Sequence, residues 1–193
     1  NESDTDKVPF SKEQRSIAYR RAKNAVDSLA FGSLHNMYAV GYEFIKHTMF
    51  FNKIEEERFT IGTKHCKRPY SASIINISAM SFGSLSNAAI LALNKGAYKG
   101  GFMHNTGEGG ISKYHLEGKG DLAFQLGTGY FGCGYTDDNG VRRFDKNMFR
   151  VNAKLPNVKV IEIKISQGAK PAHGGQLPAK KNTEEIANIR GIE

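Results

Sequence analysis

The loop over residues 166–178 carries the side chains of this sequence that are best suited to bind an anionic ligand. It contains two glutamines, a lysine and a pair of glycines, namely Gln167, Gln176, Lys170, Gly174 and Gly175. Glycine lets the backbone approach a ligand closely, while amide and ammonium groups donate hydrogen bonds. This composition indicates a binding loop for a small anion, and the alternative is a surface turn with incidental polar residues.

The segment before this loop has the pattern of a β-strand. Residues 158–165 are mostly β-branched, and their alternation places three isoleucines on one face and Glu162 and Lys164 on the other. We expect Glu162 and Lys164 to pair with each other. A strand whose carboxyl end opens into a polar, glycine-rich loop is where α/β folds place their chemistry.

Two earlier segments share this arrangement. Residues 73–80 predict a buried strand, followed by a turn at 82–84 and a helix over 87–98. Residues 102–106 predict a second strand, which enters the sequence Gly-Glu-Gly-Gly at 107–110. This strand–helix–strand order predicts a βαβ unit and therefore a parallel sheet.

The remaining elements are predicted from caps and turns. Ser11 and Gln14 form a capping-box pattern before a helix over about 12–26. We predict a hairpin tip at 138–140, a short helix over 145–154 and a last helix after Thr183, whereas 111–120 has the composition of a loop. The glycines between 122 and 133 suit close backbone approaches better than a helix. Residues 1–69 are expected to form an arm that packs on a main domain, residues 70–193.

Composition narrows the class of ligand. The 193 residues have a hydrophobic content of 39% and a net charge of +8, from 27 basic and 19 acidic residues. No arginine-rich run or nucleic-acid motif accompanies this charge, so the sequence favours a small carboxylate or phosphate over nucleic acid. No stretch reaches the roughly 18 apolar residues of a membrane span.

The two cysteines, Cys66 and Cys133, lie far apart in the sequence. Neither a zinc site nor an iron–sulfur cluster can be built from them alone. Two unpaired thiols favour a reducing compartment, so we expect a cytoplasmic protein without a disulfide. The sequence begins with neither an initiator methionine nor a signal peptide, and we expect it to be a fragment of a longer protein.

Three motifs together resemble one known family. They are residues 77–84 (ISAMSFGS), 105–110 (NTGEGG) and 166–178 (SQGAKPAHGGQLP). They are similar to the FMN-binding synthase domain of glutamate synthases, and in particular to shorter proteins of the FMN-binding glutamate synthase family, whose amino-terminal arm resembles residues 9–69. The resemblance covers nearly the whole chain but only the front part of the family's domain. It implies an α/β fold, the leading strands and helices of an FMN-type (β/α)8 TIM barrel, preceded by a helical and irregular arm.

The family resemblance also implies an activity. It is that of an FMN-dependent oxidoreductase of the class acting on CH–NH2 donors, in glutamate biosynthesis and nitrogen assimilation. In such an enzyme, 2-iminoglutarate, formed from 2-oxoglutarate and ammonia, is reduced to L-glutamate by hydride from reduced FMN. Two alternatives stay open: an FMN oxidoreductase acting on another small carboxylate, and a non-catalytic binding module derived from the barrel.

The resemblance assigns the flavin site to three strand ends. The cofactor-binding residues that it implies are Ala79, Met80, Ser81, Asn105, Thr106 and Gln167. The first three lie where the family places backbone against the flavin ring, and Gln167 is expected to hydrogen-bond its pyrimidine edge.

The same resemblance assigns the substrate ligands and the catalytic candidates. The 2-oxoglutarate ligands fall on Lys170, Gln176 and Arg190, of which the cations are expected carboxylate binders. Glu108 matches a glutamate beside the flavin, so Glu108 and Lys170 are the catalytic candidates, Glu108 to orient substrate or relay protons. Alternatively, Arg190 complements a helix end and Glu108 caps a loop. We expect His104 to be structural.

The sequence also departs from the family. It has none of the later glycine-rich loops that hold the flavin phosphate, and no amino-terminal cysteine nucleophile, since residue 1 is Asn1. We therefore expect this chain alone to bind FMN weakly or not at all and to be inactive. The electron donor is left open, as is an ammonia-supplying or glutaminase partner. An incomplete barrel exposes a strand edge, which predicts self-association.

Overall fold

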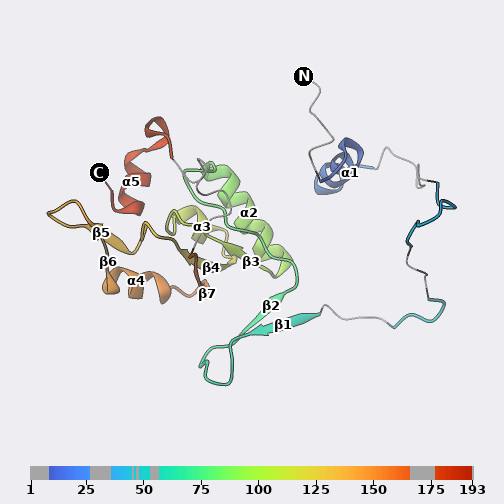
Figure 1. Ribbon diagram of the computed structural model, residues 1–193, viewed down its shortest axis with the longest axis horizontal. Coiled ribbons are helices and arrows are strands. Elements are labelled where there is room, and N and C mark those ends of the chain that lie inside the picture. Colours follow the sequence, from blue (N-terminus) through green and yellow to red (C-terminus); the bar gives the residue numbers. More distant parts are fainter. Residues whose placement is uncertain are drawn as a thin grey trace. The chain divides into compact units, whose positions relative to one another are not determined.

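The computed structural model describes residues 9–26, 36–44, 46, 48–52, 57–165 and 177–192. The chain divides into two compact units, Asn1–Asn52 and Lys53–Glu193 (Figure 1). The domain boundary near Pro69 and the packing of the arm stay predictions. Within the described ranges, no helix is both long and apolar enough to cross a membrane.

In the described residues of the first unit there is one helix, α1 (Lys12–Ala22). Its capping box is confirmed, because Gln14 N–H donates to Ser11 Oγ at 3.2 Å and Ser11 N–H donates to Gln14 Oε1 at 2.8 Å. The helix ends at Ala22 rather than near residue 26, since Asn24 adopts a left-handed backbone with φ of 53°.

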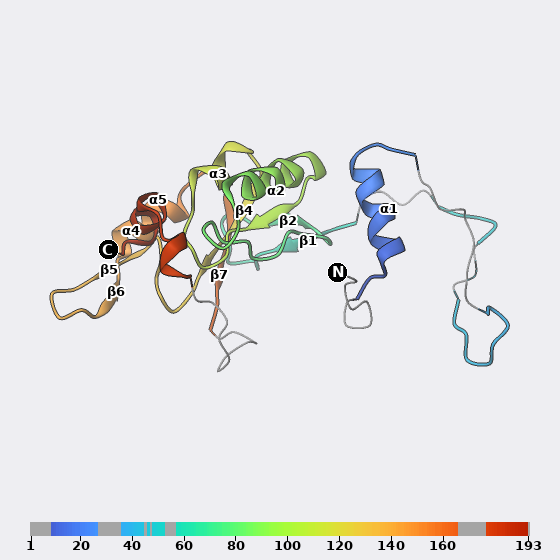
Figure 2. The same ribbon diagram turned by 90° about the horizontal axis from the view of Figure 1, so that it is seen from above.

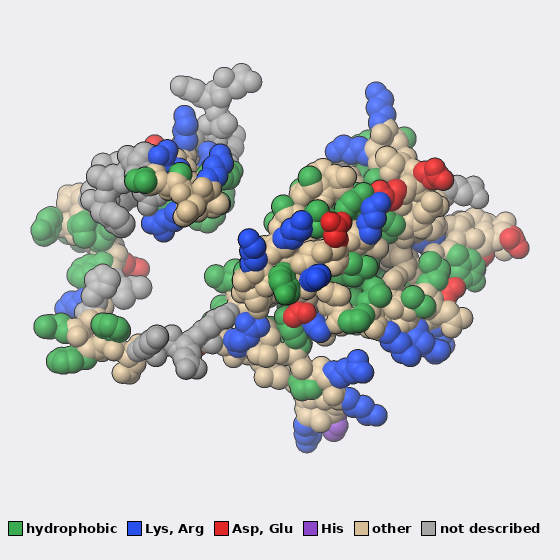
Figure 3. All heavy atoms as spheres, turned by 180° about the vertical axis from the view of Figure 1, so that it is seen from behind, with side chains coloured by type: hydrophobic (Ala, Val, Ile, Leu, Met, Phe, Trp, Pro, Cys, Tyr) green, Lys and Arg blue, Asp and Glu red, His purple; other side chains and the backbone are tan. Residues whose placement is uncertain are grey.

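The second unit begins with an antiparallel hairpin of β1 (Arg58–Ile61) and β2 (Tyr70–Ser73). The loop between these strands contains Lys64, Lys67 and Arg68, and Figure 3 shows blue side chains gathered at this tip. The hairpin supplies no strand to the parallel sheet, so it stands as a separate two-stranded element.

The predicted buried strand over residues 73–80 is wrong. β2 ends at Ser73, where Asn76 Nδ2 donates to Ser73 O at 2.7 Å and turns the chain, leaving Ile75 exposed. Only Ile77 joins the parallel sheet, through a bridge to His104. The mostly apolar residues 74–80 therefore form a turn and a single bridge instead of a continuous strand.

A three-stranded parallel sheet forms the centre of the second unit, in the order β3-β4-β7. Its strands are β3 (Met103–Asn105), β4 (Asp121–Leu126) and β7 (Val158–Ile163). The predicted parallel sheet is thus confirmed, and its strand order follows the chain order, as in βα-barrels. These strands form an open sheet, so the described residues do not show a closed barrel. β4 was not predicted as a strand.

Helices pack against this sheet and extend along its edge (Figures 1 and 2). α2 (Asn87–Gly100) has the predicted Ser86 as its amino-terminal cap and Gly101 as its carboxyl-terminal cap, and it contacts β3 and β4. The other elements are α3 (Lys113–Glu117), the hairpin β5 (Gly134–Thr136) and β6 (Arg142–Phe144), α4 (Lys146–Ala153), the 3-10 turn η2 (Ala179–Lys181) and α5 (Glu184–Arg190). The hairpin, α4 and α5 with its Thr183 cap are confirmed, whereas α3 lies in the region predicted as loop.

Buried apolar side chains join these elements. Leu122 and Phe124 of β4 are fully buried, as is Ile90 of α2. Ile90 forms a cluster with Phe82 and with Ile186 of α5. The cluster thereby attaches the carboxyl-terminal helix to the turn that follows the Ile77 bridge.

Candidate functional site

The carboxyl ends of the three parallel strands meet at one edge of the sheet. Glycine or a charged residue follows each of them within three residues: β3 is followed by Thr106-Gly107-Glu108, β4 by Gly127 and β7 by Lys164. Parallel α/β sheets bind ligands at this edge, because the strand ends present loops there. Residues far apart in the sequence are therefore placed side by side.

An ion pair links the outer two of these strand ends. Lys164 Nζ lies 3.1 Å from Glu108 Oε2, and the two side chains are 27% and 24% exposed. Gly127 lies between them, and a side chain at residue 127 would collide with the Glu108 carboxylate. The glycine after β4 thus makes the room that Glu108 occupies.

The predicted pairing of Glu162 with Lys164 is wrong. Glu162 instead accepts a hydrogen bond from Gln125 Nε2 of β4, while Lys164 reaches Glu108. Gln125 lies on the adjacent strand β4, and Glu108 follows β3 at the far side of the sheet. The alternation within a single strand reveals neither partner. The side-chain oxygen of Gln125, Oε1, is buried and has no hydrogen-bond partner in the described structure.

Met80 and Ser81 continue this row beyond β3. Met80 N–H donates to Asn105 O at 3.0 Å, which fixes the segment next to the end of β3. Gly107, with φ of 64°, packs so closely that a Cβ there would lie 2.8 Å from the Ser81 nitrogen. Ala79 is exposed. The segment 79–81 thus lies at the same edge as Glu108.

Asn105 and Thr106 use their side chains to build the turn after β3. Asn105 Oδ1 accepts from Gly107 N–H at 2.9 Å. The Thr106 hydroxyl donates to Gly107 O at 3.0 Å and accepts from Gln125 N–H at 3.1 Å. Because Thr106 is fully buried in these bonds, it can offer a ligand only its support of the turn.

Arg190, at the end of α5, lies beneath this turn. It is 7% exposed, and its guanidinium stacks 5.0 Å from the Phe131 ring and donates from Nη2 to Phe82 O at 3.4 Å. Its Nε is buried without a partner in the described structure. Burial lowers the pKa of Arg190, and the nearby Glu108 carboxylate partly offsets this effect.

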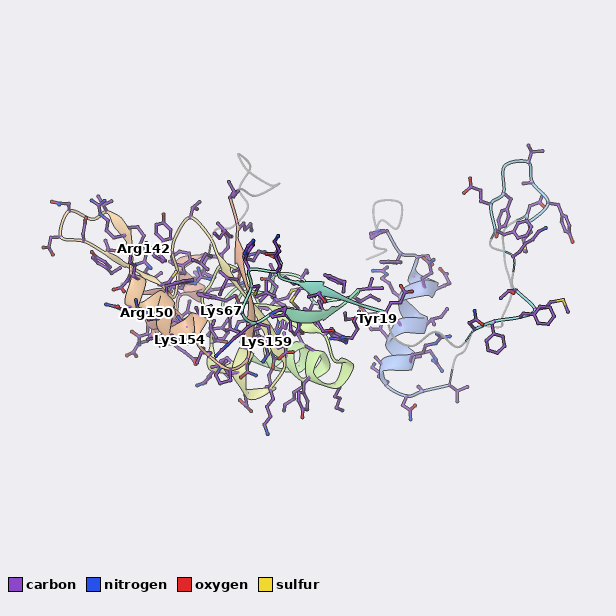
Figure 4. The ribbon with its side chains drawn as sticks, turned by 90° about the horizontal axis from the view of Figure 1, so that it is seen from below. Tyr19, Lys67, Arg142, Arg150, Lys154 and Lys159 are labelled. Carbon is purple, nitrogen blue, oxygen red and sulfur yellow. The ribbon has the colours of Figure 1, made fainter. Side chains whose placement is uncertain are left out.

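Arg142 of β6, which is labelled in Figure 4, holds the end of α5 in place through hydrogen bonds to its last carbonyls. It donates from Nε to Gly129 O at 2.8 Å, from Nη2 to Arg190 O at 2.5 Å and from Nη1 to Gly191 O. Its guanidinium also lies 5.7 Å from the Phe131 ring. Two arginines thus flank one aromatic ring, and Arg142 fixes the backbone from which Arg190 projects.

His115 of α3 was missed in the sequence and lies at the same edge. It is fully buried, Ser112 N–H donates to its Nδ1 at 3.1 Å, and its Nε2 lies 3.0 Å from Met80 O. Burial lowers the pKa of His115, in keeping with a neutral ring. The spacing Ser-x-x-His is a variant of the capping box and is the signal that could have found it.

The structure therefore brings together Met80, Ser81, Asn105, Thr106, Glu108 and Arg190 among the predicted site residues. Gln167, Lys170 and Gln176 lie outside the described residues, so their roles stay predictions. In the part of the chain that is described, no group of three or more histidine, cysteine or acidic side chains could hold a metal ion.

The fold and this edge define the class of protein: a parallel α/β protein whose candidate site lies at the carboxyl ends of its strands. Residues 17–193 match the protein family described as the conserved region in glutamate synthase, and the chain belongs to this family. No solved structure matches the chain significantly.

Curated relatives agree with this family. The chain is 42% identical over 135 residues to the glutamate synthase large subunit-like protein YerD of Bacillus subtilis, covering 69% of this chain and 25% of the relative. It is 36% identical over 146 residues to the archaeal-type glutamate synthase [NADPH] of Thermotoga maritima, covering 72% and 25%. For the archaeal glutamate synthase [NADPH] of Methanocaldococcus jannaschii the identity is 33% over 152 residues, covering 78% and 26%. The chain thus spans about a quarter of these relatives' length.

Proposed function

We propose that this chain forms part of an FMN-dependent oxidoreductase of the glutamate synthase type, which reduces 2-iminoglutarate to L-glutamate. The observation that carries the proposal is the row of groups along one sheet edge, from Met80 and Ser81 through Glu108 to Lys164. It combines backbone that can lie against a flat ring with charges that can bind a dicarboxylate. Family membership supports the same reading.

The described residues fit one side of a flavin ring. Gly107 and Gly127 let Ser81 and Glu108 pack directly against the strand ends. Backbone and a carboxylate are thereby gathered at the edge where we place the ring. Gln125 Oε1 is a buried acceptor without a partner in the described structure, and it is suited to a ring N–H. When bound, FMN would supply a hydride from its reduced form. Ala79, Met80, Ser81, Asn105, Thr106 and Gln167 are the proposed cofactor-binding residues, with Thr106 contributing through its support of the turn after β3.

Cations beside Glu108 are suited to the two carboxylates of the substrate. Lys164 Nζ is part-buried at the edge, and Arg190 Nε is buried without a partner in the described structure. We assign both to carboxylate binding, together with Lys170 and Gln176 of the 166–178 loop. Lys164 holds the Glu108 carboxylate at the sheet edge. From there we expect Glu108 to orient the substrate's carbon–nitrogen bond. Glu108 and Lys170 are the proposed catalytic residues.

The relatives' names suggest the electron donor. Two of them are named as NADPH enzymes. We infer that NADPH supplies the electrons to the gene-length protein, directly or through a partner, and that ammonia comes from solution or from an ammonia-supplying partner. A cytoplasmic location suits both NADPH and the two free thiols.

The test is an FMN titration of the gene-length protein beside this 193-residue chain, followed by flavin absorbance and fluorescence. We expect the gene-length protein to bind FMN and to form glutamate from 2-oxoglutarate and ammonia when reduced. The short chain should bind weakly or not at all and be inactive, because the three parallel strands among its described residues supply only part of an eight-stranded barrel. A gene-length protein that takes up no FMN would overturn the proposal.

A further inference from the structure

His115 stands out among the buried groups that the proposed function does not use. It lies on α3, and both of its ring nitrogens have defined partners. Backbone Ser112 N–H points at Nδ1 with a distance of 3.1 Å, and the Ser112 hydroxyl lies 2.9 Å from the same nitrogen. Because an N–H can only donate, Nδ1 must be the unprotonated nitrogen.

The protonation of the other nitrogen follows from this bond. A neutral imidazole with a bare Nδ1 carries its hydrogen on Nε2. Nε2 lies 3.0 Å from Met80 O, so it donates to this carbonyl. The ring thus connects the α3 cap to the peptide that joins Met80 to Ser81.

This connection sets the direction of a backbone donor. In a trans peptide the C=O and N–H groups point in opposite directions. Since Met80 C=O points at His115, Ser81 N–H points away from it. Ser81 N–H makes no hydrogen bond to any described residue, and its nitrogen lies against Gly107, where a Cβ would approach to 2.8 Å. Gly107, which has no side chain, is what allows the Ser81 backbone to pack this closely at the sheet edge.

We propose that His115 is a positioning residue: by holding the Met80 carbonyl, it directs Ser81 N–H into the proposed flavin site, where this group donates to an acceptor on the ring. The inference rests on the proposed function. It adds a residue on a short helix beyond the strand ends and gives α3 a role in cofactor binding.

A pair of amide substitutions separates this role from a structural one. In His115→Gln the side-chain amide reaches the position of Nε2 and can still donate to Met80 O. In His115→Asn the amide reaches only the position of Nδ1, so Asn can accept from Ser112 N–H but cannot hold the carbonyl. Both variants lose the ring to a similar degree, so each serves as the control for the other.

The experiment uses the gene-length protein, with FMN affinity from fluorescence titration and the absorbance of bound FMN as readouts. We expect His115→Asn to bind FMN about 5- to 10-fold more weakly and to alter the flavin spectrum, as for the loss of one hydrogen bond. His115→Gln should remain within about 2-fold of the natural protein. Equal behaviour of the two variants would overturn the inference while leaving the proposed function standing.

A second measurement does not depend on any variant folding. Imidazole nitrogen NMR shifts of the natural protein without FMN report the tautomer of His115. The inference requires an unprotonated Nδ1 and a protonated Nε2, and the reverse tautomer would overturn it. If the natural protein binds no FMN at all, the proposed function fails and this inference fails with it.

Discussion

The pair of Glu108 and Lys164 is the contact from which the site can be tested at the scale of single residues. It joins the loop after β3 to the end of β7. Exposed ion pairs contribute about 0–1 kcal/mol, whereas breaking a buried pair costs about 3–5 kcal/mol. With about a quarter of each side chain exposed, this pair lies between these limits.

We predict that Lys164→Met lowers the free energy of unfolding by about 1–2 kcal/mol, because Glu108 keeps a part-buried charge without this partner. Urea denaturation of the gene-length protein measures the change. Lys164→Arg keeps the charge and is the matched control. In a double-mutant cycle with Glu108→Gln we expect a coupling of about 1 kcal/mol. Strictly additive effects would show that the two side chains do not interact.

At the scale of elements, helices were easier to predict from the sequence than strands. The caps Ser11, Ser86, Asp145 and Thr183 bond to backbone within their own helix, so a few neighbouring residues suffice to locate them. β4 was missed although Leu122, Phe124 and Leu126 alternate with Asp121, Ala123 and Gln125, because its glycine-rich continuation dominated the prediction. Residues 73–80 were wrongly predicted as a strand because they form a mostly apolar run, and an apolar run alone does not specify a strand.

The site shows the same limit. The strand-end position of Glu108 could be predicted because it follows β3 directly in the sequence. Its partner Lys164, 56 residues later, could not, because only the pairing of β3, β4 and β7 places the two ends together. His115 was missed because its contact with Met80 also depends on packing between distant segments.

One edge of β7 is unpaired among the described residues. Among described residues β7 pairs only with β4, and its isoleucines face outward, with Ile163 74% exposed. An unpaired, apolar edge strand favours association between chains. We therefore expect the 193-residue chain to self-associate, and Ile163→Lys to shift it toward monomer. Sedimentation velocity across a concentration series measures this, with Ile74→Lys, an exposed residue outside the sheet, as the control. Monomeric behaviour of the unsubstituted chain at high concentration would contradict the prediction.

At the scale of the whole molecule, His104 links folding to pH. It is fully buried on β3, its Nδ1 lies 3.5 Å from Asn94 Nδ2, and its ring lies 5.3 Å from that of His115. Asn94 Oδ1 accepts from Gly120 N–H, so its Nδ2 donates to His104 and leaves the His104 N–H on Nε2 without a partner in the described structure. Burial, followed by the neighbouring His115, lowers the pKa of His104 from 6.5 to about 4.

The direction of the pH effect follows from this lowered pKa. Between pH 6.5 and about 4 the unfolded chain binds a proton at His104 that the folded chain does not, so the free energy of unfolding falls as the pH is lowered. Above pH 6.5 the histidine is neutral in both states, and its contribution is constant. A shift of this size corresponds to a loss of at most about 3 kcal/mol, to which His115 adds in the same sense.

We predict that His104→Asn reduces this pH dependence. Its side-chain oxygen can accept from Asn94 Nδ2 in place of Nδ1, so the described hydrogen bond is kept while the titrating group is removed. Urea denaturation at pH 7.5 and at pH 5 would give the loss of stability for the natural protein and the variant. A smaller loss in the variant is the expected result, even if the variant is less stable at both pH values because the ring leaves a cavity. An unchanged loss would mean that other titrating groups, such as His115 or carboxyl groups elsewhere in the chain, carry the acid sensitivity and that His104 does not.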